Sequence, residues 1–461
     1  MKADTIAAVA TAMSNSGIGI IRISGQEAVS VVDKIYVDKN GNRILNHVKS
    51  HTIHYGFIVD EAGKMIDEVM VSFMKGPKSF TAEDTVEINC HGGILVMNRI
   101  LDLVIKNGAR LAEPGEYTKR AFLNGRIDLS RAEAVMDVIS SQNEMALKNS
   151  VKQMRGSLYN KMKELRKEII YEIAFIESAL DDPEHISLEG YAEKLSKKID
   201  GFISQTEKLL TISDNGKMIQ EGIHTVIVGK PNVGKSSLLN VLAGEERAIV
   251  TEIAGTTRDI LEENIRLQNI SLRVIDTAGI RTTEDIIEKI GVEKAKKYAA
   301  QADLIVYVVD SSLPMEDSDY EIIEMIRGKR CIVLLNKSDL ESVISVEELQ
   351  DKLGNDIAMI KTSTKENTGI EDFEKAIMDM FFKGDISLEN EIMITNVRHK
   401  EALQNALLSF KEVRKSLEMD MPEDFYSIDL MNAYSSLGTI IGEEVGEDLI
   451  NEIFSKFCMG K

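Results

Sequence analysis

Residues 229–236 read Gly-Lys-Pro-Asn-Val-Gly-Lys-Ser, which is a complete phosphate-binding loop motif. The β-branched run at 225–228 predicts a buried strand before the loop, and the apolar run at 237–242 predicts the first turns of a helix after it. In this context the backbone N–H groups and the helix dipole favour phosphate. Lys235 is expected to reach the β- and γ-phosphates, and Ser236 to bind Mg²⁺. A plain glycine turn before a helix is the weaker alternative for flanks this regular.

Two later segments predict which base is bound. Asp276-Thr277-Ala278-Gly279 follows an apolar strand, and it offers a carboxylate to the Mg²⁺ shell and an N–H to the γ-phosphate. Asn336-Lys337-Ser338-Asp339 ends another apolar strand, and its Asp339 can accept two hydrogen bonds from guanine that adenine cannot donate. Ser363-Thr364-Lys365 is a looser match to the loop that supports the base. At these spacings the motifs predict GTP, and the set resembles the TRAFAC-class GTPases.

The region of the first switch narrows the class further. Gly255-Thr256-Thr257-Arg258-Asp259 places Thr257 where a Mg²⁺-binding threonine is expected. Together with Asn232, this segment resembles the potassium-activated GTPases, in which an asparagine side chain and switch oxygens hold K⁺ between the phosphates. The K⁺ ligands that this resemblance implies are Asn232, Thr251, Ile253 and Thr256. The alternative is that Asn232 is only a turn residue after Pro231.

The group that orients the catalytic water is not the usual one. Ile280 stands where Ras-like proteins carry the water-orienting glutamine, and an apolar side chain cannot replace it. A polar group elsewhere in the second switch must therefore position the water. Residues 281–293 contain four acidic candidates, which are Glu284, Asp285, Glu288 and Glu293.

The composition limits the remaining possibilities. A chain of 461 residues predicts two or three domains, and three cysteines that match neither a zinc spacing nor a disulfide framework predict a cytoplasmic protein. The chain has no 18-residue apolar run and no apolar core at its N-terminus, so we expect neither a membrane span nor a signal peptide. A formal net charge of −20 argues against broad nucleic-acid binding, so any RNA contact needs a local basic patch or a partner's surface.

The hydrophobic pattern divides the chain into three predicted domains. Residues 1–118 alternate apolar and polar positions between glycines, which predicts an α+β domain. Residues 119–216 and 384–461 show helical periodicity, and they flank an inserted α/β GTPase domain at 217–383. Apolar positions from Leu147 to Leu180 step by three and four without a break, which predicts one helix about 50 Å long. A switch joined at both ends to long helices can pass its nucleotide state to a distant site, although passive tethering is the alternative.

Several blocks outside the GTPase segment resemble the MnmE (TrmE) family of tRNA modification GTPases. They are Gly-Ile-Ile-Arg-Ile-Ser-Gly at 19–25, the blocks at 80–87, 90–93 and 114–126, and the C-terminal Phe-Cys-Met-Gly-Lys at 457–461. The resemblance implies an N-terminal domain that binds 5,10-methylene- or 5-formyl-tetrahydrofolate and forms a homodimer. It also implies a heterotetramer with the FAD-dependent partner MnmG (GidA). The two proteins together would install an aminomethyl or carboxymethylaminomethyl group on C5 of the wobble uridine of certain tRNAs.

The resemblance also implies roles for individual residues. The folate contacts are Arg22, Glu87, Arg126 and Lys461, although some relatives carry lysine where Arg126 stands. Glu288 orients the catalytic water through a bridging water, and Cys458 is required for modification, either as a nucleophile or as a positioning group. A buried small hydrophobic residue is the structural alternative for Cys458. The implied GTP contacts are Asn232, Val233, Gly234, Lys235, Ser236, Ser237, Thr251, Glu252, Ile253, Ala254, Gly255, Thr256, Thr257, Asp276, Thr277, Ala278, Gly279, Asn336, Lys337 and Asp339.

Two other functions are compatible with the GTPase motifs. A ribosome-assembly GTPase of the Era or Der type shares the phosphate-loop sequence, but Der has two GTPase domains and Era ends in a basic KH domain. This chain has one phosphate loop and an acidic helical C-terminal region. A dimerising switch without one-carbon chemistry is the third possibility, and retention of reduced folate would distinguish it.

Overall fold

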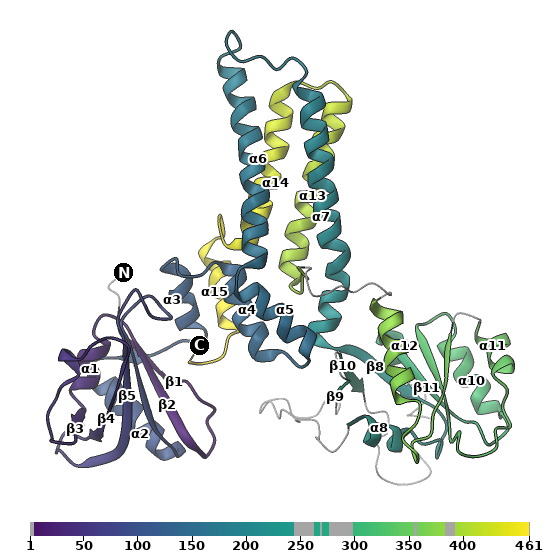
Figure 1. Cartoon of the computed structure of the whole chain (residues 1–461), viewed down its shortest axis with the longest axis horizontal. Coiled ribbons are helices and arrows are strands. Elements are labelled where there is room, and N and C mark those ends of the chain that lie inside the picture. Colours follow the sequence, from purple (N-terminus) through teal and green to yellow (C-terminus); the bar gives the residue numbers. More distant parts are fainter. Residues whose placement is uncertain are drawn as a thin grey trace. The chain divides into compact units, whose positions relative to one another are not determined.

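The structure is a computed structural model that describes residues 4–243, 262–267, 270–275, 298–354, 357–382 and 392–460. The chain divides into two compact units, which we describe separately (Figure 1). The first, called the N-terminal unit, comprises Met1–Met136, Gln153–Pro183 and Leu430–Lys461. The second, called the phosphate-loop unit, comprises Asp137–Lys152 and Glu184–Asp429.

A seven-stranded sheet forms the N-terminal part of the first unit, with strand order β3-β4-β5-β6-β2-β1-β7. Neighbouring strands are antiparallel except for β1 and β7, which are parallel. The strands are β1 (Ile6–Val9), β2 (Ser16–Ser24), β3 (Tyr36–Asp38), β4 (Thr52–Val59), β5 (Met65–Met74), β6 (Thr85–Gly92) and β7 (Arg110–Leu111). The connecting helices are α1 (Ala28–Asp33), the 3₁₀ turn η1 (Leu45–His47) and α2 (Ile94–Lys106).

Alternation along the strands explains which face of this sheet is covered. In β5, Val69, Val71 and Phe73 are buried while Glu68 and Met70 are exposed, as expected when successive side chains point to opposite faces. The buried face packs against α1 and α2 in one apolar cluster. The predicted α+β character of the N-terminal region is therefore confirmed.

The helices of the N-terminal unit include one departure from prediction. They are α3 (Glu116–Leu123), α6 (Ser157–Asp181), α15 (Glu447–Ser455) and parts of α4 (Leu129–Ser140) and α14 (Glu423–Ile441). The predicted single helix over 147–180 is wrong, because α5 (Glu144–Met154) ends before Gly156 and α6 begins after it. Gly156 has φ +92°, and a Cβ there would overlap the guanidinium of Arg131. The apolar periodicity continues across this break and therefore conceals it.

A six-stranded sheet forms the centre of the phosphate-loop unit, with strand order β13-β12-β11-β8-β10-β9. All neighbours are parallel except β9 and β10. The strands are β8 (Ile223–Val228), β9 (Glu262–Arg266), β10 (Ser271–Ile275), β11 (Leu304–Asp310), β12 (Cys331–Asn336) and β13 (Ala358–Lys361). The three apolar strands that the motifs required, β8, β10 and β12, are thus confirmed.

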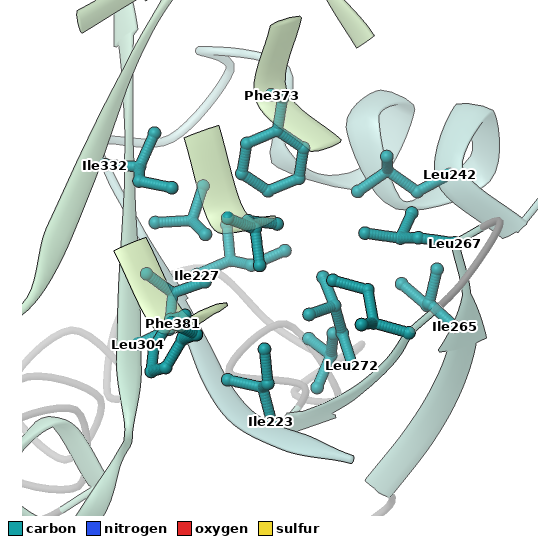
Figure 2. Packing of buried hydrophobic residues seen from close by; sticks show 14 of the residues in the cluster. Ile223, Ile227, Leu242, Ile265, Leu267, Leu272, Leu304, Ile332, Phe373 and Phe381 are labelled. Atoms are coloured by element: carbon teal, nitrogen blue, oxygen red, sulfur yellow. The ribbon is translucent and has the colours of Figure 1, made fainter. Parts of the chain in front are cut away.

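Helices cover both faces of this sheet, which makes it doubly wound. They are α8 (Lys235–Ala243), α10 (Asp317–Ile326), α11 (Val346–Leu353) and α12 (Ile370–Phe382). Leu242 of α8 and Phe373 of α12 pack on one face with Ile227 and Leu272, as Figure 2 shows. On the other face α10 and α11 pack over the second row of strand residues, including Val226 and Val333. This core fixes the loops at the carboxyl ends of the parallel strands, where ligands bind in folds of this type.

Two long helices of the same unit flank the sheet domain in sequence, α7 (Tyr191–Glu221) before it and α13 (Val397–Glu418) after it. They pack along each other through Phe202 and Phe410, whose ring centroids lie 5.4 Å apart. Leu195, Ile199 and Phe202 of α7 are buried. So are Leu403, Phe410 and Val413 of α13. Within the described ranges, no helix has the length and apolarity needed to cross a lipid bilayer.

Candidate functional site

The phosphate loop lies between β8 and α8, as the sequence predicts. Lys235 is the first residue of α8, and its Nζ donates hydrogen bonds to the carbonyl oxygens of Gly229 (2.7 Å) and Lys230 (2.6 Å). Burial lowers the pKa of the Lys235 ammonium. A phosphate group that approaches the loop would supply the negative charge that offsets this loss of hydration. Val233 is buried under the loop, whereas Asn232, Ser236 and Ser237 are exposed.

The predicted guanine-binding segment is joined directly to this loop. Asn336 donates from Nδ2 to the carbonyl oxygen of Val233 (2.8 Å), and its Oδ1 accepts from the backbone N–H of Thr364 (3.3 Å). One side chain therefore connects the phosphate loop, the end of β12 and the loop after β13. The three segments are separated in sequence, and the parallel sheet brings them together.

Asp339 is oriented by a residue that the sequence singled out only weakly. The hydroxyl of Ser363 donates to Asp339 Oδ1 at 2.7 Å, and this hydrogen bond holds the pKa of the Asp339 carboxyl below its ordinary value. A fixed, ionised carboxylate is the acceptor that the N1–H and 2-amino group of guanine require. Although the match at 363–365 is loose, its Ser363 makes the hydrogen bond that orients Asp339 toward the base.

A second tether on the phosphate loop was not predicted. Lys230 forms ion pairs with Glu316 (3.0 Å) and Asp319 (2.6 Å) at the start of α10, and Asp319 also accepts from the Tyr307 hydroxyl at 3.0 Å. Asp319 is 1% exposed, so its charge is balanced by Lys230 rather than by water. Position 230 is variable within the motif, so nothing in the sequence indicated this role.

Part of the predicted GTP site lies outside the described residues. These residues are Thr251, Glu252, Ile253, Ala254, Gly255, Thr256, Thr257, Asp276, Thr277, Ala278, Gly279 and Glu288. Two of the predicted Mg²⁺ ligands and three of the four predicted K⁺ ligands are among them. Their roles stay predictions.

A second cluster in the N-terminal unit brings together residues from both ends of the sequence. Arg22 of β2 and Glu87 of β6 are direct cross-strand partners, and their side chains form an ion pair at 2.8 Å. Arg22 also donates from Nη1 to the carbonyl oxygen of Gly460 at 2.9 Å. Two of the predicted folate residues are therefore adjacent, and one of them, Arg22, contacts the residue that precedes Lys461. Lys461 itself lies outside the described residues.

The C-terminal tail is held on the sheet by further contacts. The N–H of Gly115 donates to the carbonyl oxygen of Cys458 at 3.4 Å. Gly460 has φ +83°, and a Cβ there would lie 2.6 Å from the carbonyl oxygen of Val9 at the end of β1. Both the left-handed backbone and the close approach require glycine at 460. The tail thus passes close to the end of β1 and beside Arg22 of β2.

Cys458 differs from the other two cysteines in its surroundings. Burial raises the pKa of Cys90 to about 11 and that of Cys331 to about 12, so both thiols stay protonated at neutral pH. Cys458 is exposed. The interpretation of Cys458 as a buried small hydrophobic residue is therefore wrong, and its thiol is accessible to solutes.

Two aromatic residues complete this cluster, and neither was singled out from the sequence. Tyr117 donates from its hydroxyl to the carbonyl oxygen of Arg22 (2.7 Å), and its ring lies 5.7 Å below the Arg22 guanidinium. Phe80 packs against the buried apolar cluster that contains Tyr117, and its ring lies 5.1 Å from the Arg126 guanidinium. These contacts join segments around residues 22, 80, 117 and 126, and sequence spacing does not reveal that these segments meet.

Comparisons with known proteins cover almost the whole chain. A family model described as the MnmE helical domain matches residues 129–458, and one described as the GTP-binding protein TrmE N-terminus matches residues 5–126. A tRNA modification GTPase MnmE of Lachnoclostridium phytofermentans is 58% identical, with 100% of both chains covered. One of Alkaliphilus oremlandii is 48% identical, with 99% of both chains covered.

Among solved structures, a variant of Aquifex aeolicus Era with GDP.AlF4− is 27% identical, with a TM-score of 0.27. The match covers 41% of this chain and 66% of the Era chain. The full-length matches include the N-terminal and helical regions, which a ribosome-assembly GTPase of the Era or Der type leaves unexplained. That alternative is therefore set aside.

Proposed function

Because the chain belongs to the MnmE family of tRNA modification GTPases, we propose that its GTP cycle is activated by K⁺ and drives a folate-dependent modification. The reaction adds an aminomethyl or carboxymethylaminomethyl group to C5 of the wobble uridine of certain tRNAs. It takes place in the cytoplasm, in a heterotetramer of a homodimer of this chain with the FAD-dependent protein MnmG (GidA). A tetrahydrofolate derivative, either the 5,10-methylene or the 5-formyl form, supplies the carbon.

The phosphate-loop unit provides the GTP half of this function. Lys235 faces the inner side of the loop, and Ser236 presents an exposed hydroxyl at the start of α8, which suits an oxygen ligand of Mg²⁺. Mg²⁺, when bound, neutralises charge on the phosphates. Asn232 has φ +64° and an exposed side chain at the bend of the loop, which supports its assignment as a K⁺ ligand with Thr251, Ile253 and Thr256. We assign orientation of the attacking water to Glu288.

The cluster formed by Arg22, Glu87 and the C-terminal tail provides the folate half of the proposed function. Arg126 is exposed, and among the described residues its guanidinium interacts only with the Phe80 ring, so its charge is available for the glutamate carboxylates of a folate. Glu87 uses one oxygen in its ion pair with Arg22, and its other oxygen can accept N–H groups of the pterin ring. These donors and acceptors fit a reduced folate. Lys461 extends from Gly460, and we assign it to the same ligand.

The single observation that carries the proposal is the contact of Arg22 with Gly460. It joins a predicted folate residue to the tail that bears the exposed Cys458. This contact supports the proposal that a one-carbon donor and a reactive thiol or positioning group act at one site. In the proposed domain arrangement, residues 1–118 carry this folate site, residues 119–216 and 384–461 form the helical domain, and residues 217–383 form the GTPase domain.

The homodimer is supported by exposed apolar side chains on β4 and β5 of the N-terminal sheet. Ile53, Met65 and Met70 are apolar and at least half exposed, with exposed fractions of 67%, 59% and 50%. Such a group of large apolar side chains is typical of a protein–protein contact. Association through this face would bury it.

Nucleoside analysis of tRNA tests the proposed function. In a strain that lacks the gene, wobble uridines should be unmodified at C5, and the wild-type gene should restore the modification. An unchanged nucleoside profile in the deletion strain would refute the proposal. Retention of reduced folate by the purified chain tests the folate half separately, because a switch without one-carbon chemistry would retain none.

A further inference from the structure

One segment of the chain carries a charge opposite to that of the whole. The formal net charge is −20, yet residues 148–167 contain seven basic residues and one acidic residue. The basic residues are Lys148, Lys152, Arg155, Lys161, Lys163, Arg166 and Lys167. A concentration of positive charge on an acidic protein requires an explanation, because like charges repel each other and gain nothing for the fold.

The structure separates the structural cations of this segment from the available ones. Arg166 is buried in an ion pair with Glu443 and stacks on Tyr434, and Lys161 pairs with Glu164. Arg155, Lys163 and Lys167 are exposed instead. None of these three has a carboxylate partner within the part of the chain that the structure describes. We call Arg155, Lys163 and Lys167 the basic stripe.

Aromatic side chains flank the basic stripe on the same side of α6. Tyr159, Lys163, Lys167 and Tyr171 follow one another at intervals of four residues, which places them in a line along the helix. Lys163 lies 5.6 Å from the Tyr159 ring and Arg131 lies 4.9 Å from it. Tyr171 is 65% exposed. Tyr159 is half-buried. Cations beside aromatic rings are typical of surfaces that bind nucleic acids.

Packing connects this surface to the helix that leads into the tail. Arg131 belongs to α4, whose Leu129 and Ala132 pack against Phe454 and Phe457 at the end of α15. Phe457 immediately precedes Cys458. All of these residues belong to the N-terminal unit. A polyanion held on the basic stripe would therefore be held by the same packed group of helices that carries the thiol.

We propose that the basic stripe binds the phosphate backbone of the substrate tRNA. This inference rests on the proposed function and names the surface that meets the nucleic acid. Lysine and arginine contacts to phosphate fix position and orientation without selecting a sequence. The stripe therefore anchors the tRNA body, while the choice of tRNA and of the wobble base depends on other contacts.

The salt dependence of tRNA binding tests the stripe. Each phosphate contact contributes about 0.7–0.9 to the slope of log affinity against log salt. We expect Lys163→Ala/Lys167→Ala to lower the magnitude of this slope by about 1.4–1.8, measured by filter binding of total tRNA to the full-length chain in KCl. Lys163→Arg/Lys167→Arg keeps the charge and should keep the slope. Lys194→Ala/Lys197→Ala on α7 removes two exposed lysines elsewhere and should leave the slope unchanged.

Unchanged thermal unfolding and unchanged GTP hydrolysis in all variants show that both units are folded. An unaltered slope in Lys163→Ala/Lys167→Ala, an equal loss in the α7 control, or the absence of salt-dependent tRNA binding by the wild type would each overturn the inference. So would a stripe-dependent preference for anionic lipid vesicles over tRNA. None of these results changes the nucleoside profile of the deletion strain, so the proposed function stands or falls separately.

Discussion

The phosphate-loop site and the tail site are built in opposite ways. The first is made of short sequence motifs at the ends of β8 and β12, each of which carries its own chemistry before any long-range contact forms. The second joins Arg22 to Gly460, 438 positions apart, and has no local motif that would reveal it. The difference shows that a nucleotide site is specified by local backbone geometry, whereas the tail site exists only when the C-terminus is seated. Variants of the tail should therefore impair modification and leave GTP hydrolysis intact.

The strongest test of this separation is Cys458→Ser. We expect it to abolish wobble-uridine modification and to leave GTP hydrolysis unchanged, because the exposed thiol lies in the N-terminal unit and the phosphate loop lies in the other unit. Nucleoside analysis and steady-state GTP hydrolysis measure the two outcomes. The buried Cys90→Ser serves as the comparison for loss of a thiol as such. Normal modification in Cys458→Ser would remove the thiol from the mechanism.

The converse change should act on GTP alone. Glu288→Ala is expected to bind GTP normally and to hydrolyse it about 100-fold more slowly, because a misplaced attacking water costs reaction rate rather than affinity. Single-turnover hydrolysis in the presence of K⁺ measures the effect. Glu284→Ala, a neighbouring acid of the same segment, should behave like the wild type. Equal rates for Glu288→Ala and the wild type would require a different water-orienting group.

The same contrast explains how much could be predicted from the sequence. Lys235, Asn336 and Asp339 were predictable because each belongs to a contiguous motif with one chemical use. The loose match at 363–365 indicated Ser363 only weakly, and the Lys230–Asp319 pair could not be predicted, since it meets only when the parallel sheet forms. For the tail site, resemblance to the family alone indicated the residues, and no physical argument from spacing could have done so.

Backbone geometry was the other limit of prediction. The helical periodicity of apolar residues is the same on both sides of Gly156, so it predicted one helix where the structure has two. The break depends on the packing of Arg131 from a different helix against the glycine. Such a contact is invisible to any pattern confined to one segment.

Potassium dependence tests the ion half of the GTP site. We expect K⁺ to accelerate hydrolysis by at least about tenfold over Na⁺, since a cation held between the phosphates stabilises the charge of the transition state. Asn232→Ala should remove the difference between the two salts while GTP binding is kept. Equal rates in K⁺ and Na⁺ for the wild type would refute the assignment of Asn232.

Seating of the tail can be disturbed without touching any predicted contact. Gly460→Ala introduces a Cβ at φ +83° and 2.6 Å from the Val9 carbonyl oxygen, so the tail should shift away from Arg22. We expect the affinity for reduced folate to fall by about five- to tenfold, measured by equilibrium dialysis. Gly446→Ala is the matched control, because its φ is −68° and its Cβ would meet nothing within 4 Å. Equal folate affinities in the two variants would show that the seated tail does not form the site.

The smallest effect on function is expected for Ser363, which lies outside the Asn-Lys-Ser-Asp motif and donates a hydrogen bond to its aspartate. Ser363→Ala removes the hydroxyl that donates to Asp339 Oδ1, so the carboxylate loses its fixed orientation and its pKa rises toward the ordinary value. Asp339 stays ionised at neutral pH in either case, and only its position changes. GTP affinity should therefore fall by about threefold, the cost of a single partly exposed hydrogen bond.

ITP lacks the 2-amino group and makes one of the two hydrogen bonds with Asp339. Its affinity should therefore fall less than that of GTP, and the preference for GTP over ITP should narrow. Competition binding with both nucleotides measures the ratio, with Ser342→Ala as the control because its hydroxyl donates to Ile344 away from the motif. An unchanged ratio would mean that the Asn-Lys-Ser-Asp motif fixes its own aspartate, and the nucleotide site would then be still more local than the structure indicates.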